Sequence, residues 1–316
     1  MRICGPAFLL TLVLLPVWLT ATVPAENLRI ATYNLQNYLS TDRMVEGQWH
    51  SSYPKPESEK KVLRRNLLSV RPDLLALQEI GGLPYLRELQ MDLSDAGLEY
   101  PFFAYMESVD GERNIAVLSR LPIQSIVQHS DLEFPYFDEI ETVNRGMLEV
   151  RLSVTAAHRE KVLKVFVVHL KSRYTSNKAD PQSEKRRVKE AEACRNRILK
   201  GINREGEGLY CILGDFNDYP GSAAVRRFCR KGNFLIGNYV RAEDDRGELW
   251  TYFWKKQSQY STVDGFIVSP ALFPFISGGQ GHIHSSPKGQ KGSDHRLVYL
   301  DFAWRGTGGR DENGKN

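Results

Sequence analysis

Residues 209–218 read LYCILGDFND, and this stretch decides the fold. Its continuous apolar run, Leu209 to Leu213, is typical of a β-strand that is covered on both faces. Cys211 within the run is expected to be a buried, unreactive residue. Side chains two positions apart in a strand point the same way, so Asp215 and Asn217 are expected to lie on one side. The stretch therefore predicts a buried strand that carries polar side chains at its end.

Similar runs and helical patterns extend in both directions from this stretch. One α/β domain over residues 26–305 is expected, since no linker or internal repeat is visible. Residues 306–316 are glycine-rich and polar and are expected to be disordered, and Ser40–Pro56 is expected to be a long loop. Strands are predicted at Leu28–Asn34, Asp73–Ile80, Asn114–Arg120, Met147–Val154, Val162–Lys171, Leu209–Phe216, Thr262–Val268 and Leu297–Trp304, and helices at Glu57–Val70, Glu184–Ile202 and Ser222–Cys229.

Composition excludes several classes of protein. The 316 residues are 25% charged and 41% hydrophobic, and their mean hydropathy is −0.39. These values exclude a disordered chain, a collagen-like repeat and a polytopic membrane protein. The formal net charge of +4, from 42 basic and 38 acidic residues, permits a polyanionic partner without requiring one.

The first 25 residues resemble a secretory signal. Arg2 precedes an apolar stretch from Pro6 to Leu19, and Val23 and Ala25 have the spacing that a signal peptidase accepts. The stretch is shorter than the roughly 20 residues that span a bilayer, so cleavage is favoured over a membrane anchor. We expect a secreted or periplasmic protein with no stable membrane insertion. In that oxidising environment Cys194 and Cys229 could pair, although sequence alone does not establish the geometry.

Polar residues recur where the predicted strands end. Each has an ordinary structural explanation by itself, because Asn and Asp favour turns and a single His is more often structural than catalytic. An oxygen-rich group of Asn34, Glu79 and Asp294 suits a hard cation such as Mg²⁺, whereas zinc would need more His or Cys. Histidines beside carboxylates could transfer protons near neutral pH. The residues concerned are Asn34, Glu79, His169, Asp215, Asn217, Asp264, Asp294 and His295.

Six motifs resemble, in order, those of the endonuclease/exonuclease/phosphatase superfamily, and most of all its deoxyribonuclease-I-like branch and exported bacterial relatives. The resemblance covers residues 28–302. It implies an α/β, four-layered sandwich of two packed mixed β-sheets flanked by helices, and a Mg²⁺-dependent phosphodiesterase, with Mn²⁺ or Ca²⁺ as alternatives. The motifs are Tyr33-Asn34-Leu35, Leu77-Gln78-Glu79-Ile80, His169-Leu170-Lys171-Ser172, Gly214-Asp215-Phe216-Asn217-Asp218, Val263-Asp264-Gly265-Phe266 and Ser293-Asp294-His295.

The same resemblance implies a role for each matching residue. Glu79 is similar to the main metal ligand, with Asn34 and Asp294 around the same ion. His295 resembles the general base, oriented by Asp264. Asp215 and Asn217 resemble the residues that hold the attacking water and a phosphate oxygen, and His169 resembles a histidine that binds the phosphate and protonates the leaving oxygen. Two weaker local matches add Glu112, paired with that histidine, and Arg145, which contacts the nucleic-acid backbone; for both, a solvated surface charge is the competing interpretation.

The substrate is less well defined by sequence. A monomeric, endonuclease-like enzyme acting on DNA or RNA is favoured, with a sphingomyelinase or other phospholipase C, or a phosphomonoesterase, as the alternative. Residues 184–200 form a basic helix that could follow a phosphate backbone or be an ordinary solvated helix. Gly81 and Asp110 stand where the deoxyribonuclease branch has its minor-groove arginine and tyrosine, which argues against a strict preference for duplex DNA. Trp250, Tyr252, Phe253 and Trp254 could stack bases or pack in the core. A non-catalytic binding module would normally lack one of His169, Asp215, Asp264 and His295.

Overall fold

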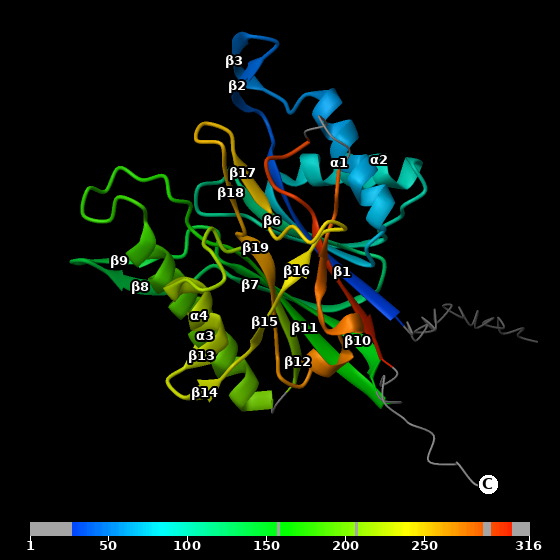
Figure 1. Ribbon diagram of the computed structural model, residues 1–316, viewed down its shortest axis with the longest axis vertical. Coiled ribbons are helices and arrows are strands. Elements are labelled where there is room, and N and C mark those ends of the chain that lie inside the picture. The colour runs from blue at the N-terminus through cyan, green and yellow to red at the C-terminus, as the bar shows by residue number, and fades with distance from the viewer. Residues whose placement is uncertain (1–26, 157–158, 206–207, 287–291, 305–316) are drawn as a thin grey trace, which may run out of the picture.

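A computed structural model describes residues 27–156, 159–205, 208–286 and 292–304 (Figure 1). The expected signal at residues 1–25 and the expected tail at residues 306–316 lie outside these ranges. Within them, no helix has the length and apolar character needed to cross a membrane.

Two large mixed sheets form the centre of the molecule. In the first, β1 pairs in parallel with β4 and antiparallel with β21. In the second, β12 pairs in parallel with β11 and antiparallel with β19. The order of the first sheet is β16 (Ala242–Glu243), β20 (Gly281–Ile283), β21 (Val298–Ala303), β1 (Asn27–Tyr38), β4 (Leu74–Ile80), β6 (Asn114–Ser119) and β5 (Phe102–Met106), and that of the second is β15 (Asn238–Val240), β19 (Asp264–Val268), β12 (Leu209–Asp215), β11 (Arg159–His169), β10 (Met147–Ala156) and β7 (Ile123–His129).

The helices cover the outer faces of both sheets, as Figure 1 shows. Helices α1 (Glu57–Val70) and α2 (Leu83–Asp95) share a buried apolar cluster with the outward-facing residues of β1 and β4. Helices α3 (Glu184–Glu205) and α4 (Ala223–Cys229) do the same for β11 and β12. Between the sheets, alternate residues such as Ile30, Val165 and Leu213 form a third cluster. The predicted four-layered α/β sandwich is therefore confirmed.

The alternation of side chains explains why the strands read as continuous apolar runs. In β12, Cys211 and Leu213 belong to the cluster between the sheets, whereas Tyr210 and Ile212 belong to the cluster beneath α3 and α4. Both faces of a strand in such a sandwich are covered, so nearly every position is apolar. All eight predicted strands and the three predicted helices are present, with ends displaced by a few residues.

The short elements were mostly not predicted. Ser40–Pro56 is not simply a long loop, because β2 (Thr41–Val45) and β3 (Gln48–Tyr53) form a hairpin that projects from the domain (Figure 1). Helix α2 begins after Gly82 with proline in its first turn, a start signal that the sequence offered. The remaining elements are β8 (Glu133–Tyr136) with β9 (Glu139–Thr142), β13 (Arg230–Lys231) with β14 (Phe234–Leu235), β17 (Tyr252–Trp254) with β18 (Gln259–Ser261), and the 3₁₀ turns Phe273–Phe275 and Ser277–Gly279.

Cys194, Cys211 and Cys229 are free thiols, so the pairing of Cys194 with Cys229 is not formed. Cys211 is fully buried in the core, as its place in the apolar run predicts, and burial raises the pKa of its thiol well above the usual range.

Candidate active site

Strand register brings the polar residues of distant motifs together at one end of the two sheets. His169 is the register partner of Asp215 in the parallel pair β11–β12, and Asp215 is the partner of Asp264 in the antiparallel pair β12–β19. The strand position before Asp215 requires glycine, because Gly214 has φ of 139° and an added Cβ would lie 1.9 Å from the Val168 carbonyl oxygen. The last residues of β11 and β12 and the first of β19 therefore face one space.

A bulge in β1 shapes the acidic half of this space. Gln36, Asn37 and Glu79 have positive φ angles of 49°, 56° and 59°, and the register of β1 on β4 shifts between Asn34 and Tyr38. Such conformations cost about 1–3 kcal/mol each in non-glycine residues and cluster at functional sites. Here the bulge directs the Asn37 backbone amide to Glu79 Oε2 at 2.9 Å.

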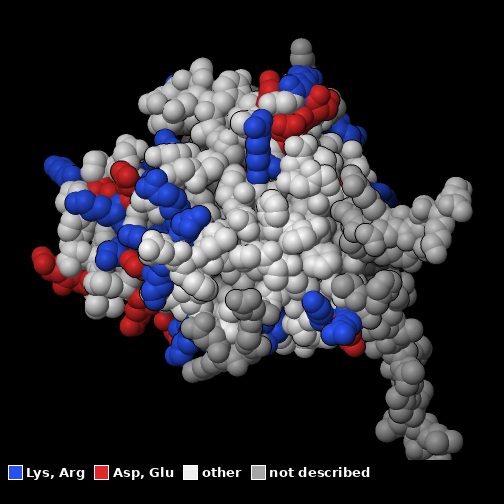
Figure 2. All heavy atoms as spheres, turned by 60° about the horizontal axis from the view of Figure 1, so that its bottom comes forward, with Lys and Arg blue, Asp and Glu red and all other residues white. Residues whose placement is uncertain are grey.

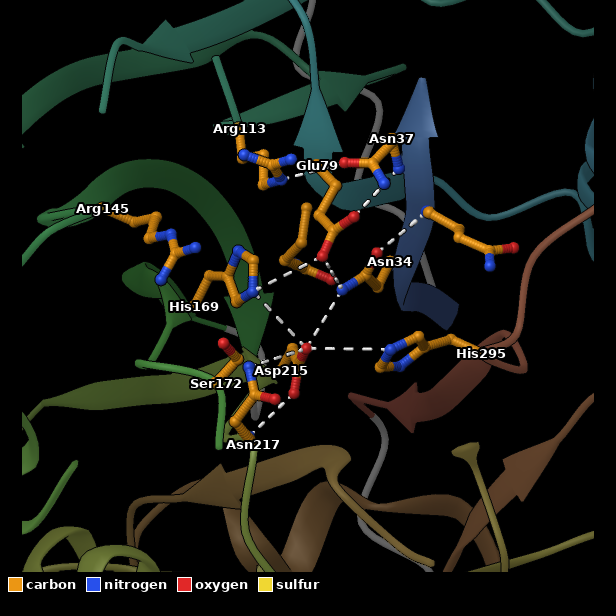
Figure 3. Close-up of polar contacts among 12 residues, drawn as sticks. Asn34, Asn37, Glu79, Arg113, Arg145, His169, Ser172, Asp215, Asn217 and His295 are labelled. Carbon is orange, nitrogen blue, oxygen red and sulfur yellow. Dashed lines mark hydrogen bonds and ion pairs between the residues drawn. The ribbon is translucent and has the colours of Figure 1, made fainter. Parts of the chain in front are cut away.

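Asn34, Glu79 and Asp294, the predicted metal ligands, lie around this bulge. Asn34 Nδ2 donates to Glu79 Oε1 at 3.3 Å and to Asp215 Oδ2 at 3.0 Å (Figure 3). The segment that carries Asp294 is tied to the same bulge, because the Asp294 amide donates to Gln36 Oε1 at 3.0 Å.

The chemistry of these donors fits a divalent cation. Burial raises the pKa of Asp294, and the nearby carboxylate of Glu79 raises it further, although His295 opposes the increase. Two carboxylates that repel each other form the hard, oxygen-rich donor set that Mg²⁺ prefers. Asn34 turns its Nδ2 toward these carboxylates, while its Oδ1 accepts from the Gln36 backbone amide at 2.9 Å.

His295 is held by Asp264 in an orientation suited to proton transfer. Its Nδ1 lies 2.8 Å from Asp264 Oδ2, and its Nε2 lies 3.9 Å from carboxylate oxygens of both Asp215 and Asp294. Burial alone would lower the pKa of His295, but the carboxylates of Asp264 and Asp215 outweigh burial and raise it well above 6.5. Asp215, Asp264 and His295 could also hold a metal by distance alone. Since His295 Nδ1 already contacts Asp264, these contacts favour proton transfer through hydrogen bonds over metal binding by the three residues.

Asp215 is the central acceptor of the site. Its Oδ1 accepts from the Asn217 backbone amide at 2.7 Å, and its Oδ2 accepts from the Asn217 side chain at 3.1 Å. Burial raises the pKa of Asp215, and the charge of Asp264 adds to the increase. The expectation that Asp215 and Asn217 share one side is met by these contacts.

His169 lies on the other side of Asp215. Its Nε2 is 3.5 Å from Asp215 Oδ2 and 3.9 Å from Glu79 Oε1. Burial lowers the pKa of His169 well below 6.5, and the positive charge of Arg145 lowers it further. His169 is therefore neutral at pH 7 in the free chain, and its Nδ1 is buried without a hydrogen-bond partner among the described residues.

The predicted pair of Glu112 with His169 is not formed. Glu112 lies in a turn after Asp110, with 58% of its side chain exposed, and its carboxylate contacts Arg113 Nη1 at 2.9 Å. The turn directs this carboxylate to Arg113, which in turn donates to Asn37 Oδ1 at 2.9 Å. The surface-charge interpretation is the one the geometry favours for Glu112.

Arg145 is buried and points into the site. Only 7% of the residue is exposed, and Nη2 lies 3.9 Å from Asp110, whereas Nε and Nη1 have no partner among the described residues. Figure 3 shows the guanidinium beside His169, on the side away from His295. Arg145, His169 and His295 line a cavity of about 580 Å³. Its other cationic lining residues are Arg113, Arg173 and Lys256.

The basic helix differs from this lining. Arg187 on α3 pairs with Asp218, Arg186 with Glu141 and Glu190, Arg195 with Glu192, and Arg197 with Asp131. On the side where Figure 1 places α3 and β8, Figure 2 shows basic side chains intermixed with acidic ones. The arginines of α3 therefore stabilise the fold, and the ordinary-helix interpretation is favoured.

The sequence analysis missed two residues that shape the site, since Asn37 and Gln36 contact Glu79 and Asp294. A signal existed for Asn37, because an Asn three residues beyond Asn34 is suited to a left-handed bulge. Tyr252, which was expected to stack on bases or pack in the core, has its ring 4.8 Å from that of His295. Nothing near Tyr252 in the sequence pairs it with His295.

The sequence profile of the Endonuclease/Exonuclease/phosphatase family matches residues 31–295, most of the chain. The chain belongs to this family. Membership of the superfamily is thereby confirmed, while the deoxyribonuclease-I-like branch stays a prediction. No curated protein sequence is significantly similar to this family member.

Solved structures share the fold at low sequence identity. The human Nocturnin catalytic domain with bound sulfate matches with a TM-score of 0.59 at 17% identity, over 88% of this chain and 94% of that one. A beta toxin from Staphylococcus aureus matches at 0.58 and 16% identity, over 86% and 99%. A beta toxin mutant from the same organism, with bound magnesium ions, matches at 0.58 and 14% identity, over 87% and 99%. At these identities the likeness shows the fold alone.

Proposed function

We propose that this family member is an exported, Mg²⁺-dependent phosphodiesterase that hydrolyses nucleic acid as a monomer. The observation that carries the proposal is the division of one cavity between carboxylates and cations. Glu79 and Asp294 line this cavity, and so does the guanidinium of Arg145, which is partly without partners among the described residues. A divalent cation is complementary to the carboxylates, and a phosphodiester to the guanidinium.

Asn34, Glu79 and Asp294 would hold the cation, which supplies charge neutralisation to the phosphate and the leaving oxygen when bound. A magnesium-bound structure of the same fold supports this choice of ion. Mn²⁺ and Ca²⁺ remain the alternatives.

His295 would take the proton of the attacking water through Nε2. Asp264 holds the other ring nitrogen, which fixes the tautomer and stabilises the imidazolium that forms. Asp215 and Asn217 would position that water and a phosphate oxygen. Figure 3 shows His295 and Arg145 on opposite sides of Asp215, so a phosphate held by Arg145 would lie within the same space as the base.

Arg145 and His169 would bind the phosphate. His169 would orient the phosphate and protonate the leaving oxygen, since the negative charge of a bound phosphate favours the protonated imidazole. The Arg145 nitrogens that have no partner among the described residues can donate to phosphate oxygens.

Nucleic acid is favoured among phosphodiesters because the cations at the rim suit a repeating backbone charge. Arg173 and Lys256 line the cavity beyond Arg145, and the tip of the β17–β18 hairpin reads Lys255-Lys256-Gln257-Ser258, which is not suited to insertion into lipid. The alternative, a phospholipid phosphodiesterase, is favoured by Met44 and Trp49 on the β2–β3 hairpin, which are 61% and 65% exposed.

Incubation of the chain lacking residues 1–25 with duplex DNA, single-stranded DNA, RNA, sphingomyelin and inositol phosphates tests the proposal. Each substrate is assayed with Mg²⁺, Mn²⁺, Ca²⁺ and a chelator. Cleavage of a nucleic acid that stops in the chelator supports it. Turnover confined to sphingomyelin or to phosphomonoesters would show that nucleic acid is not the substrate. Cleavage by the His169→Ala variant at the wild-type rate would show that the proposed site is not the active site.

A further inference from the structure

A second cavity of about 600 Å³ adjoins the site, and we call it the side recess. It lies between α1, the β17–β18 hairpin and residues 292–296. The residues that it shares with the first cavity are Gln36, Tyr252, Trp254, Lys256, Asp294 and His295. Cavities of about 300–1,000 Å³ hold small-molecule ligands. A ligand with its phosphate at His295 could therefore extend into the side recess.

Aromatic rings form one wall of the side recess and are tied to the catalytic segment. Tyr252 and Phe253 of β17 line it, and the Phe253 amide donates to the Asp294 carbonyl at 2.9 Å. Trp250 is fixed by the Arg296 guanidinium, 4.3 Å from its ring centroid, and Arg296 is held by buried Asp244 at 2.7 Å. These contacts hold the rings in place relative to His295.

Two polar side chains that line the side recess, Asn66 and Tyr33, can form further hydrogen bonds. Asn66 is 3% exposed, and its Nδ2 donates to the Tyr33 hydroxyl at 3.1 Å, while its Oδ1 is buried without a partner among the described residues. Because the Tyr33 hydroxyl accepts that bond, its own hydrogen can be donated to another acceptor.

The acceptor Asn66 Oδ1 and the donor hydroxyl of Tyr33 complement the edge of a nucleobase, and the aromatic rings of the side recess complement its face. A base presents an amino or imino donor next to a ring-nitrogen or carbonyl acceptor, and its face stacks on aromatic rings. Arg246 and Lys255 also line the side recess, and their positive charges suit the phosphate of a nucleotide. A lipid chain would leave the polar atoms of Asn66 and Tyr33 unsatisfied.

We propose that the side recess binds the base of a nucleotide next to the scissile phosphate, with Asn66 Oδ1 and the Tyr33 hydroxyl contacting its edge. This inference rests on the proposed function, since it makes the substrate a nucleic-acid strand. A base inside the side recess cannot remain stacked in a duplex, so the preferred substrate is single-stranded.

Direct binding to the metal-free chain is the first test. Affinities for adenosine 5′-monophosphate and ribose 5-phosphate are measured for the wild type by titration calorimetry. Loss of base stacking alone corresponds to a change of roughly 10-fold, so the nucleotide should bind at least about 10-fold more tightly. Asn66→Leu and Trp250→Leu should reduce this ratio to below about threefold, and thermal melts show which variant is folded. Trp49→Leu changes an exposed tryptophan that lines neither cavity, and it should leave the ratio unchanged.

Cleavage is the second test. The wild type should cleave a single-stranded oligonucleotide at least about 10-fold more efficiently, in kcat/KM, than the same strand with abasic residues. Equal affinity for the two phosphates, or an equal effect of Trp49→Leu, overturns the side recess as a base site even where phosphodiesters are hydrolysed. Preferential nucleotide binding without hydrolysis of any phosphodiester would retain the side recess and overturn the proposed function.

Discussion

Helix α3 and the wall of the site both carry buried arginines, but the two sets differ in their contacts. Arg195 on α3 is 2% exposed and hydrogen-bonded to Glu192 and Asn196. Arg145 in the site is 7% exposed and has two nitrogens without a partner in the part of the chain that the structure describes. A buried charge that lacks partners destabilises a fold unless a ligand completes it. The difference teaches that an unpartnered cation indicates a phosphate site better than a basic stretch of sequence does.

The same comparison extends to histidines and predicts the largest effect. His295→Ala should lower kcat by about 10³–10⁴-fold, because no other described group at its position is set to accept a proton from water. Steady-state rates on a phosphodiester measure this. His129→Gln is the matched control, because His129 is also buried and paired with a carboxylate, Glu149 at 2.9 Å, but lies outside the site. Similar losses in both variants would contradict the assignment of His295.

Asp264→Asn should lower kcat by about 10²-fold and shift its pH dependence. The base must be neutral, so the rate falls as pH decreases through the pKa of His295. Asp264 raises that pKa by stabilising the imidazolium, and removal of its charge therefore lowers the pKa and moves the acid limb to lower pH, by about one unit or more. A pH profile of kcat tests this, and a limb displaced to higher pH would be inconsistent with this role of Asp264.

Arg145→Met should lower kcat/KM by about 10–100-fold, as expected for loss of about 1.5–3 kcal/mol from a charged hydrogen bond. The free energy of unfolding should stay the same or increase, because the unpartnered nitrogens are removed with the charge. Arg195→Met should show the reverse, with unfolding free energy reduced by about 1–2 kcal/mol and kcat/KM within twofold. Urea melts and initial rates on the same preparations decide between these patterns.

The sequence was sufficient to predict the architecture, because strands that are covered on both faces appear in the sequence as continuous apolar runs. The apolar runs at Leu209–Leu213 and elsewhere predicted the strands, and the order of the six motifs predicted the sandwich. Helix α1 was predicted from Glu57 to Val70 with the bounds that the structure has. The β2–β3 hairpin was missed because its residues are mostly exposed and carry no such pattern.

The sequence predicted which residues form the candidate site, but it did not predict most of the contacts between them. Asn34, Glu79, His169, Asp215, Asn217, Asp264, Asp294 and His295 lie around one space, although their roles remain proposals. Glu112 contacts Arg113 in an exposed turn whose backbone amide is bound by Asp110, and these contacts could not be predicted from the local match. The pairing of the α3 arginines depends on Asp218, Glu141 and Asp131, which are distant in sequence, so no local pattern could reveal it.

The dependence of nucleic-acid cleavage on Mg²⁺ concentration, for the wild type and Glu79→Gln, tests the central claim most directly. We expect no cleavage by the wild type in a chelator, and a rate that saturates as Mg²⁺ is restored. Glu79→Gln removes one ligand charge and should need at least about 10-fold more Mg²⁺ for half of its maximal rate. Cleavage that persists in the chelator, or a half-saturating concentration that Glu79→Gln leaves unchanged, would contradict the assignment of the acidic half of the cavity to a divalent cation.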